Sequence, residues 1–340
     1  MKTYQLKNNE AEVHITELSD NKRLIEVKSD KFSLPVKDQR IETHYPIALI
    51  EKFLEVKGPR TMNDEIRREQ DPLYTRKCLE PDILAYCSKD NFKNKRILDF
   101  GCGAGASSII LARMFPDAEI VGIDLSEKLL YLAKERAKFY QYDNISFYCN
   151  PDGKTLPKDL GNFDYIILSA VFEHLLPDER KTVLKIIWSM LKPDGIFFLN
   201  QTPYRFFPFE GHTTRLFFVN YLPDKLAYIY AKKFSKRVRE GQTWQQLLRR
   251  GIRGGYPKQI LEILKQSDKG FKPVLLKPQK NGLKDRVDVW YQGYAVSIAD
   301  KYPKMRKIQS VLRIFAKVIY KISGIVFLPT VSVAIRKEEL

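Results

Sequence analysis

The stretch "RILDFGCGAGASS", residues 96–108, constrains the fold more than any other part of the sequence. A short apolar strand pattern leads into three glycines within five positions, and the helical pattern "ASSIILARMF" follows. Without a side chain, glycine lets the backbone turn tightly and lets a ligand lie directly against it. In doubly wound sheets, ligands bind at the carboxyl ends of the strands, where this turn falls. We therefore expect a ligand-binding loop after a buried strand.

The sequence after this loop alternates strand patterns with helical patterns of about 10–14 residues, which is typical of a parallel sheet. The further strand patterns are "EIVGIDL", "ISFYC", "FDYIILSAV", "IFFLNQT", "FKPVLLKP" and "VFLPTVSVAIRK". "FDYIILSAV" is almost continuously apolar, as expected of a strand buried on both faces. The predicted fold class is α/β, with a doubly wound, mostly parallel, seven-stranded sheet of the Rossmann-like type.

Four segments are expected along the chain. Residues 1–90 form an N-terminal extension of short strands and a helical lid, with helix breaks at Asp71-Pro72 and Glu80-Pro81. Residues 91–202 form the ligand-binding core, and residues 203–255 form an insertion on the substrate side. Residues 256–340 complete the sheet and contain a basic amphipathic insertion at 281–324.

Charge is distributed unevenly between the two parts of the chain. Residues 1–200 contain 30 Lys and Arg against 31 Asp and Glu, whereas residues 201–340 contain 28 against 10. This excess indicates an acidic partner, such as a phosphate, a nucleic acid or anionic lipid headgroups. The four cysteines have no metal-binding spacing, so free thiols and no metal site are expected. A polar N-terminal segment and the lack of a long apolar run predict a cytoplasmic location.

The glycine motif alone leaves two cofactors open. Gly101, Gly103 and Ala106 also satisfy the alanine variant of the dinucleotide motif, which would indicate an NAD-dependent oxidoreductase. The surrounding sequence, however, resembles the class I S-adenosylmethionine-dependent methyltransferases. The resemblance lies in "LDFGCGAG", "GIDLS", "FDYIILSAVFEHL" and "MLKPDGIFFLN", in that order, and it covers residues 92–210 and more loosely 256–276 and 326–336.

The resemblance implies S-adenosyl-L-methionine as the cofactor and assigns residues to it. The glycines would make room for its methionine part, Asp99 would organise that loop or the ammonium group, and Asp124 would bind the ribose hydroxyls. Family members carry an acidic residue soon after the third strand, and Asp152 takes that place only with a shift of one position. The predicted cofactor-binding residues are Asp99, Gly101, Cys102, Gly103, Gly105, Asp124, Leu125, Asp152, Gly153 and Ser169.

Two of the four histidines follow strands at the edge where the acceptor should bind. Either His174 or His212 is a suitable general base, because neutral imidazole accepts a proton near physiological pH. The segment "TPYRFFPFEGHTTRLFFVNYLP" also resembles a "P-N-R…P-x-E-x-H…L-P" signature of bacterial and archaeal methyltransferases often found with glycan or lipid biosynthesis functions, with Tyr204 in place of the asparagine. Arg205, Glu210 and Arg215 are the candidate substrate-binding residues.

Residues 304–322 form an amphipathic helical pattern. Its predicted apolar face comprises Met305, Ile308, Leu312, Phe315, Ile319 and Ile322, and the opposite basic face comprises Arg306, Arg313, Lys317 and Lys321. Such a helix would lie peripherally at an anionic membrane surface, on the inner face of the membrane, or would pack on the domain with its basic face solvated.

The resulting functional hypothesis is methyl transfer to an oxygen of a small, glycosyl or lipid-linked acceptor. The alternative is methylation of RNA, which basic residues interleaved with aromatic ones would suit. A third class comprises an NAD-dependent oxidoreductase and an inactive cofactor-binding module.

Overall fold

A seven-stranded sheet forms the centre of the computed structural model, which describes residues 2–6, 9–28, 39–153 and 160–340. The strand order is β12-β13-β9-β8-β5-β6-β7, and only β13 runs antiparallel to the others. The strands are β5 (Arg96–Phe100), β6 (Glu119–Asp124), β7 (Ile145–Cys149), β8 (Phe163–Ser169), β9 (Leu191–Pro203), β12 (Phe271–Leu275) and β13 (Thr330–Glu339). The predicted fold class is confirmed, and the chain order reverses between β5 and β8, beside the glycine loop.

Helices cover both faces of this sheet. Helices α3 (Thr75–Leu84) and α4 (Ala106–Met114) pack on one face, while α6 (Pro177–Met190) and α9 (Pro257–Lys265) pack on the other. Helix α5 (Glu127–Phe139) lies beside β7. Side chains of a strand alternate between the faces, so Ile97 joins the α3–α4 side and its neighbour Leu98 joins the α6–α9 side. The apolar run in β5 is thereby buried on both faces of the sheet.

The N-terminal segment forms a separate four-stranded antiparallel sheet, as its alternating pattern predicted. Its strands are β1 (Thr3–Leu6), β2 (Glu12–Glu17), β3 (Arg23–Lys28) and β4 (Arg40–Thr43). Helix α2 (Ile47–Gln70) packs on this sheet and changes direction at Gly58, whose φ is +68°. The expected helix break at Asp71-Pro72 is confirmed, but the break at Glu80-Pro81 is wrong. Helix α3 continues through Pro81, because burial of its apolar side chains outweighs the one backbone hydrogen bond that proline removes.

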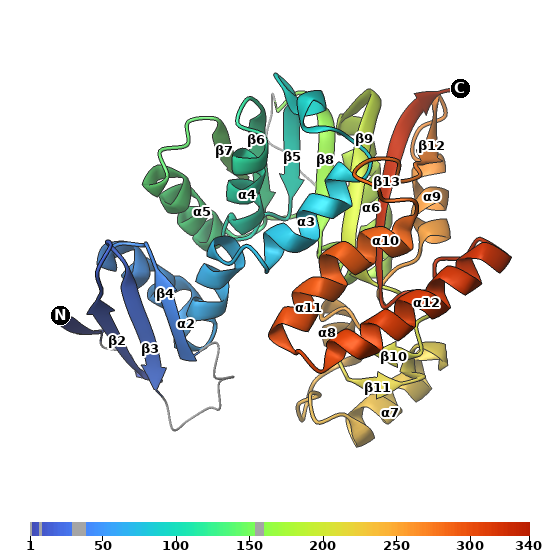
Figure 1. Cartoon of the computed structure of the whole chain (residues 1–340). Coiled ribbons are helices and arrows are strands. Elements are labelled where there is room, and N and C mark those ends of the chain that lie inside the picture. Colours follow the sequence, from blue (N-terminus) through green and yellow to red (C-terminus); the bar gives the residue numbers. More distant parts are fainter. Residues whose placement is uncertain (1, 7–8, 29–38, 154–159) are drawn as a thin grey trace.

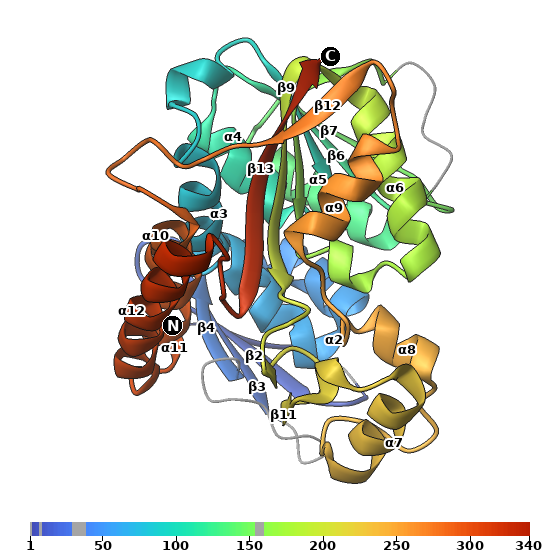
Figure 2. The same ribbon diagram turned by 90° about the vertical axis from the view of Figure 1, so that its right-hand side faces the viewer.

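The two insertions lie at the carboxyl end of the parallel strands, as does the N-terminal sheet (Figures 1 and 2). Residues 203–255 contain β10 (Phe209–Glu210), β11 (Leu216–Phe217), η3 (Val219–Tyr221), α7 (Asp224–Phe234) and α8 (Trp244–Arg249). Residues 281–324 contain α10 (Arg286–Trp290), the π-helical η4 (Tyr291–Ala295), α11 (Val296–Lys301) and α12 (Met305–Ser323). Short η1 (Lys89–Phe92) precedes β5, and η2 (Phe172–His174) follows β8. These additions surround the edge where a ligand would bind.

Helix α12 confirms the predicted helix but corrects its expected basic face. Arg313 forms an ion pair with Asp288 at 2.9 Å, and Lys317 pairs with Asp285 and Asp288, both at 2.6 Å. These two cations therefore hold the helix onto the start of α10 while remaining partly exposed. Leu312, on the expected apolar face, packs in the cluster beneath the helix. The exposed side of α12 is instead an apolar stripe of Ile308, Val311, Phe315, Val318 and Ile322.

Candidate functional site

The glycine loop after β5 requires glycine for two different reasons. Gly101, Gly103 and Gly105 have φ angles of +79°, +56° and +81°, a region that side chains disfavour. A Cβ on Gly101 would lie 2.5 Å from Cγ2 of Val171, so the loop also packs closely against the segment after β8. A Cβ on Gly103 would meet no atom within 4 Å. The loop is thus tight on one side and open on the other.

Asp124, the last residue of β6, connects this loop to the start of α5. Its Oδ2 accepts a hydrogen bond from the backbone N–H of Gly103 at 2.9 Å, and its Oδ1 accepts one from the N–H of Ser126 at 3.0 Å. Each carboxylate oxygen has a second lone pair for a ligand hydroxyl. The adjacent Leu125 is 57% exposed, which leaves a large apolar side chain available to cover a flat ring.

Asp99 lies beneath the loop and organises it. The hydroxyls of Ser107 and Ser108 both donate to its Oδ2 at 2.6 Å, which ties the end of β5 to the first turn of α4. Burial raises the pKa of Asp99, while the two serine hydrogen bonds favour the ionised form. Cys102 contributes its backbone to the loop, but its thiol packs in an apolar cluster, and burial raises its pKa. The thiol therefore faces away from the open side.

A cavity of about 430 Å³ opens beside Gly101, Asp124 and Leu125, whereas Asp99, Cys102, Gly103 and Gly105 are not among the residues that line it. It is lined by Phe100, Gly101, Ile123, Asp124, Leu125, Asn150, Pro151, Asp152, Gly153, Ala170, Val171, His174, Leu175, Glu179, Thr182, Val183 and Arg249. Asn150 is buried, and neither its amide nitrogen nor its amide oxygen has a hydrogen-bond partner among the described residues. Buried amides are normally paired, so Asn150 is suited to bind a polar ring edge in this cavity.

The cavity fits the parts of S-adenosylmethionine. The carboxylate of Asp124 suits the ribose hydroxyls, the side chain of Leu125 and the amide of Asn150 suit the adenine, and the open side of the glycine loop suits the methionine part. Ser169, at the end of β8, also has a buried hydroxyl without a hydrogen-bond partner among the described residues, although it does not line the cavity. Asp152 and Gly153, two of the residues predicted to bind the cofactor, also line this cavity.

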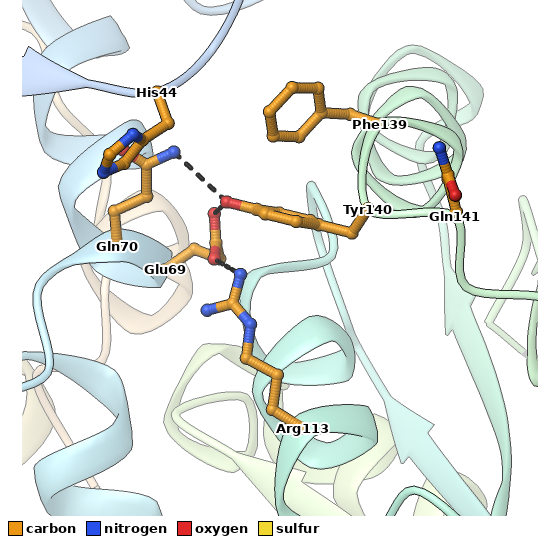
Figure 3. A pocket seen from close by; sticks show the side chains of 7 residues that line it. All are labelled: His44, Glu69, Gln70, Arg113, Phe139, Tyr140 and Gln141. Carbon is orange, nitrogen blue, oxygen red and sulfur yellow. Dashed lines mark hydrogen bonds and ion pairs between the residues drawn. The ribbon is translucent and has the colours of Figure 1, made fainter. Parts of the chain in front are cut away.

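A second cavity, of about 420 Å³, lies between α2, α4 and α5 and is drawn in Figure 3. Four of its polar side chains are bound to one another. Tyr140 donates a hydrogen bond to Glu69 at 3.1 Å and accepts one from Gln70 at 3.2 Å, and Arg113 forms an ion pair with Glu69. This cavity shares no lining residue with the first. Its residues hold the N-terminal segment on the core.

The two candidate bases, His174 and His212, lie together, with ring centroids 5.5 Å apart. His174 also lines the cofactor cavity. Its Nδ1 lies 2.8 Å from the carbonyl oxygen of Arg249, which can only accept, so Nδ1 carries the proton and Nε2 has a free lone pair. His212 is exposed at the surface, and desolvation by the groups around its ring, followed by the nearby His174, lowers its pKa from the ordinary value. His212 is therefore neutral at pH 7.

The three residues predicted to bind substrate occupy different positions. Glu210 is buried and accepts hydrogen bonds from the N–H groups of its own loop, including those of His212 at 2.9 Å and Thr213 at 2.8 Å. The guanidinium of Arg205 donates to the carbonyl of Asn220, and burial lowers its pKa to about 10. Both side chains hold the insertion together. Arg215 is exposed, with a φ of +57°.

Sequence reasoning missed three residues. Asn150 directly follows β7, near the position where the family has an acidic residue, but it carries an amide instead of the carboxylate that the resemblance predicts there. Glu173, for which the sequence predicts a structural rather than a catalytic role, is buried beside the two histidines. Arg136, on α5, belongs to none of the motifs, yet its buried guanidinium donates a hydrogen bond to the carbonyl of Ala104 in the glycine loop at 2.7 Å.

Comparisons with known proteins agree with this geometry. Residues 91–251 match the family described as "Methyltransferase domain". A ubiquinone biosynthesis O-methyltransferase from Coxiella burnetii is 35% identical over 123 residues, covering 36% of this chain and 50% of the relative. A demethylmenaquinone methyltransferase from Lactococcus lactis is 32% identical over 151 residues, covering 44% and 57%. The chain thus spans about half the length of the curated relatives it matches.

Among solved structures, the plantazolicin methyltransferase BpumL, in complex with S-adenosylhomocysteine, is 14% identical with a TM-score of 0.45, covering 86% of this chain and 95% of that one. The matched family covers the glycine loop, the end of β6 and the segment after β8, which together line the cavity. Residues 91–251 are therefore a methyltransferase domain, as the resemblance to the class I S-adenosylmethionine-dependent methyltransferases predicted.

Proposed function

We propose that the protein transfers the methyl group of S-adenosylmethionine to an oxygen atom of an apolar or lipid-linked small molecule. The observation that carries the proposal is the pair of imidazoles: His174 lies at the wall of the cofactor cavity, and the ring of His212 lies 5.5 Å from it, centroid to centroid. A hydroxyl must lose its proton to become a good nucleophile, and neutral imidazole groups are suited to assist that loss. The curated relatives named above include a ubiquinone biosynthesis O-methyltransferase, whose name implies an oxygen acceptor.

The chain's own residues would act mainly by positioning. The cofactor supplies an activated methyl group on a sulfonium, so the protein must hold the acceptor oxygen in line with that methyl. The glycine loop, Asp99 and Asp124 would fix the cofactor from one side. The segment from Val171 to His174 and helix α8 would close the other side, because Arg249 of α8 forms an ion pair with Glu179 across the cavity mouth.

The preference for an apolar acceptor rests on the exposed surface near the carboxyl end of the sheet. On α12, Val311 is 67% exposed, Val318 is 52% exposed and Ile322 is 81% exposed. Lysines and arginines flank this stripe, and residues 301–337 contain no acidic residue. An apolar stripe bordered by cations suits an anionic membrane surface, with the apolar side chains at the lipid boundary. Among the described residues, no helix is long and apolar enough to cross a membrane.

Radiolabelled methyl transfer into fractionated cell extracts tests this proposal. Purified protein with labelled S-adenosylmethionine is incubated separately with an organic-solvent lipid extract, the aqueous small-molecule fraction and total RNA. We expect labelled product in the lipid extract, and we expect the label to resist mild base, as an ether does and an ester does not. Label confined to RNA would refute the proposed acceptor class and favour RNA methylation.

A further inference from the structure

Three potential metal ligands meet beside the cofactor cavity, although the sequence spacing gave no sign of them. Glu173, His174 and His212 each offer a ligand atom, and these atoms all lie within 4.8 Å of one another. The first two come from η2 after β8, and the third comes from the insertion after β9. Two imidazoles and one carboxylate, with the remaining positions open, are a ligand set that binds divalent transition metals in enzymes.

Glu173 has the features of a carboxylate that lacks a partner. It is fully buried at the base of the cluster. Its Oε2 accepts a hydrogen bond from the hydroxyl of Thr202 at 3.2 Å, whereas Oε1 has no hydrogen-bond partner and lies 3.8 Å from Nε2 of His174. Ionising a buried carboxylate is costly unless the charge is hydrogen-bonded, paired with another charge or bound to a cation. The unpaired oxygen is on the side of the imidazole, where an ion would lie.

The second contacts of His174 also suit metal binding. Its Nδ1–H donates to the carbonyl of Arg249, which fixes the ring orientation and leaves the lone pair of Nε2 toward Glu173. Metal-binding histidines typically donate their other N–H to a carbonyl or carboxylate in this way. In this structure the hydrogen bond from Nδ1 orients the ring so that Nε2 points toward Oε1 of Glu173, 3.8 Å away.

A glycine makes room for the cluster. A Cβ on Gly251 would lie 2.9 Å from Cδ2 of His212 and 3.0 Å from Cγ of Glu173, and its φ is +91°. Gly251 directly follows the segment whose carbonyl orients His174. The backbone between α8 and α9 is therefore packed against two of the three candidate ligands.

We propose that Glu173, His174 and His212 bind one divalent transition-metal ion, of which Zn²⁺ is the representative. If the proposed O-methylation is correct, which this role requires, the acceptor oxygen would bind at an open position of the ion. The acceptor proton then leaves to water, the oxygen lone pair forms the new C–O bond, and the C–S bond breaks with its electron pair retained on sulfur. In this arrangement the two imidazoles would assist loss of the acceptor proton through the ion that they hold, rather than by accepting the proton themselves.

Metal binding can be measured directly, independently of methyl transfer. Metal-free protein is titrated with Co²⁺, a spectroscopic substitute for Zn²⁺, and visible absorption is recorded, followed by competition with Zn²⁺. The native chain is expected to bind one equivalent with the absorption bands of a nitrogen- and oxygen-ligated ion. His212→Ala is expected to weaken binding at least tenfold, and His14→Ala, which changes a histidine in the separate N-terminal sheet, should bind like the native chain.

Glu173→Gln separates metal binding from a structural role. Glutamine has the same shape without the charge, so it should weaken Co²⁺ binding at least tenfold while the midpoint of thermal unfolding of the metal-free protein stays the same or rises. A lower midpoint with unchanged Co²⁺ affinity would overturn the proposal, as would equal Co²⁺ affinity of the native chain and His212→Ala. Binding of S-adenosylhomocysteine, measured on the same samples, reports separately on the cofactor site and the proposed function.

Discussion

Arg136→Met should destabilise the protein and loosen the glycine loop at the same time. The Arg136 guanidinium is fully buried between α2 and the core. It donates to the hydroxyl of Tyr45 at 3.0 Å, to Oε1 and the carbonyl of Glu65 at 3.2 and 2.6 Å, and to the carbonyl of Ala104 at 2.7 Å. Methionine fills a similar volume but donates nothing, so the change removes these bonds without opening a large cavity.

The expected loss of stability depends on which interactions the partners of Arg136 retain. Removing one member of a buried ion pair typically destabilises a protein by about 3–5 kcal/mol, because the other charge is left buried. Glu65 still has Lys57, whose Nζ lies 3.0 Å from Oε2, so we expect the lower end, about 3 kcal/mol. The freed Ala104 carbonyl also leaves the glycine loop less ordered. Affinity for S-adenosylhomocysteine should then fall about tenfold, which corresponds to about 1.4 kcal/mol.

Urea denaturation followed by tryptophan fluorescence measures the stability, and calorimetry measures the affinity. Lys134→Met is the matched control, because this exposed residue lies on the same helix and should change neither quantity appreciably. If Arg136→Met lowered the free energy of unfolding by less than about 1 kcal/mol, a value typical of an exposed ion pair, the buried network would not have the role assigned to it. A loss of stability without any loss of affinity would show that the buried network does not order the glycine loop.

Three further changes have distinct expected outcomes. Burial raises the pKa of Asp82, which accepts a hydrogen bond from Ser332, from 3.8 to about 8. In the unfolded chain this carboxyl ionises at lower pH than in the native protein, so the native protein loses stability as the pH rises between these two pKa values. In urea denaturation, the free energy of unfolding of Asp82→Asn should therefore rise relative to that of the native chain by up to about 1.4 kcal/mol per pH unit between about pH 4 and pH 8. A difference that does not change with pH would contradict this. The double variant Val311→Ser, Val318→Ser should no longer float with anionic vesicles, and its midpoint of thermal unfolding should not change. Unchanged flotation would show that α12 does not bind the membrane. Asn150→Ala should weaken S-adenosylhomocysteine binding about tenfold, with little change in thermal midpoint, because its amide bonds to no described residue.

The fold and the glycine loop were predictable because both follow from local patterns. Three glycines between an apolar strand and a helix specify a tight turn wherever the rest of the chain lies. The periodicity of the strands and helices then determines the layers of the sheet. Asp124 was found for the same reason, since the end of a strand can be located from the sequence alone.

The contacts across long sequence distances were not predictable. His212 meets Glu173 only because the insertion after β9 folds back and Gly251 leaves space for both side chains. Likewise, the cations of α12 were assigned to solvent from helical spacing, although Asp285 and Asp288, more than 20 residues earlier, pair with Lys317. Helical periodicity shows which side chains share a face, but not which face meets a partner.

Calorimetric titration with S-adenosylhomocysteine tests the central claim most directly. The native chain should bind one equivalent, Asp124→Ala should bind at least tenfold more weakly, and Asp117→Ala should bind like the native chain, because this exposed residue precedes the opposite end of the same strand. No binding by a folded native chain, or equal affinity of the native chain and Asp124→Ala, would contradict the assignment of this cavity to the methyl donor.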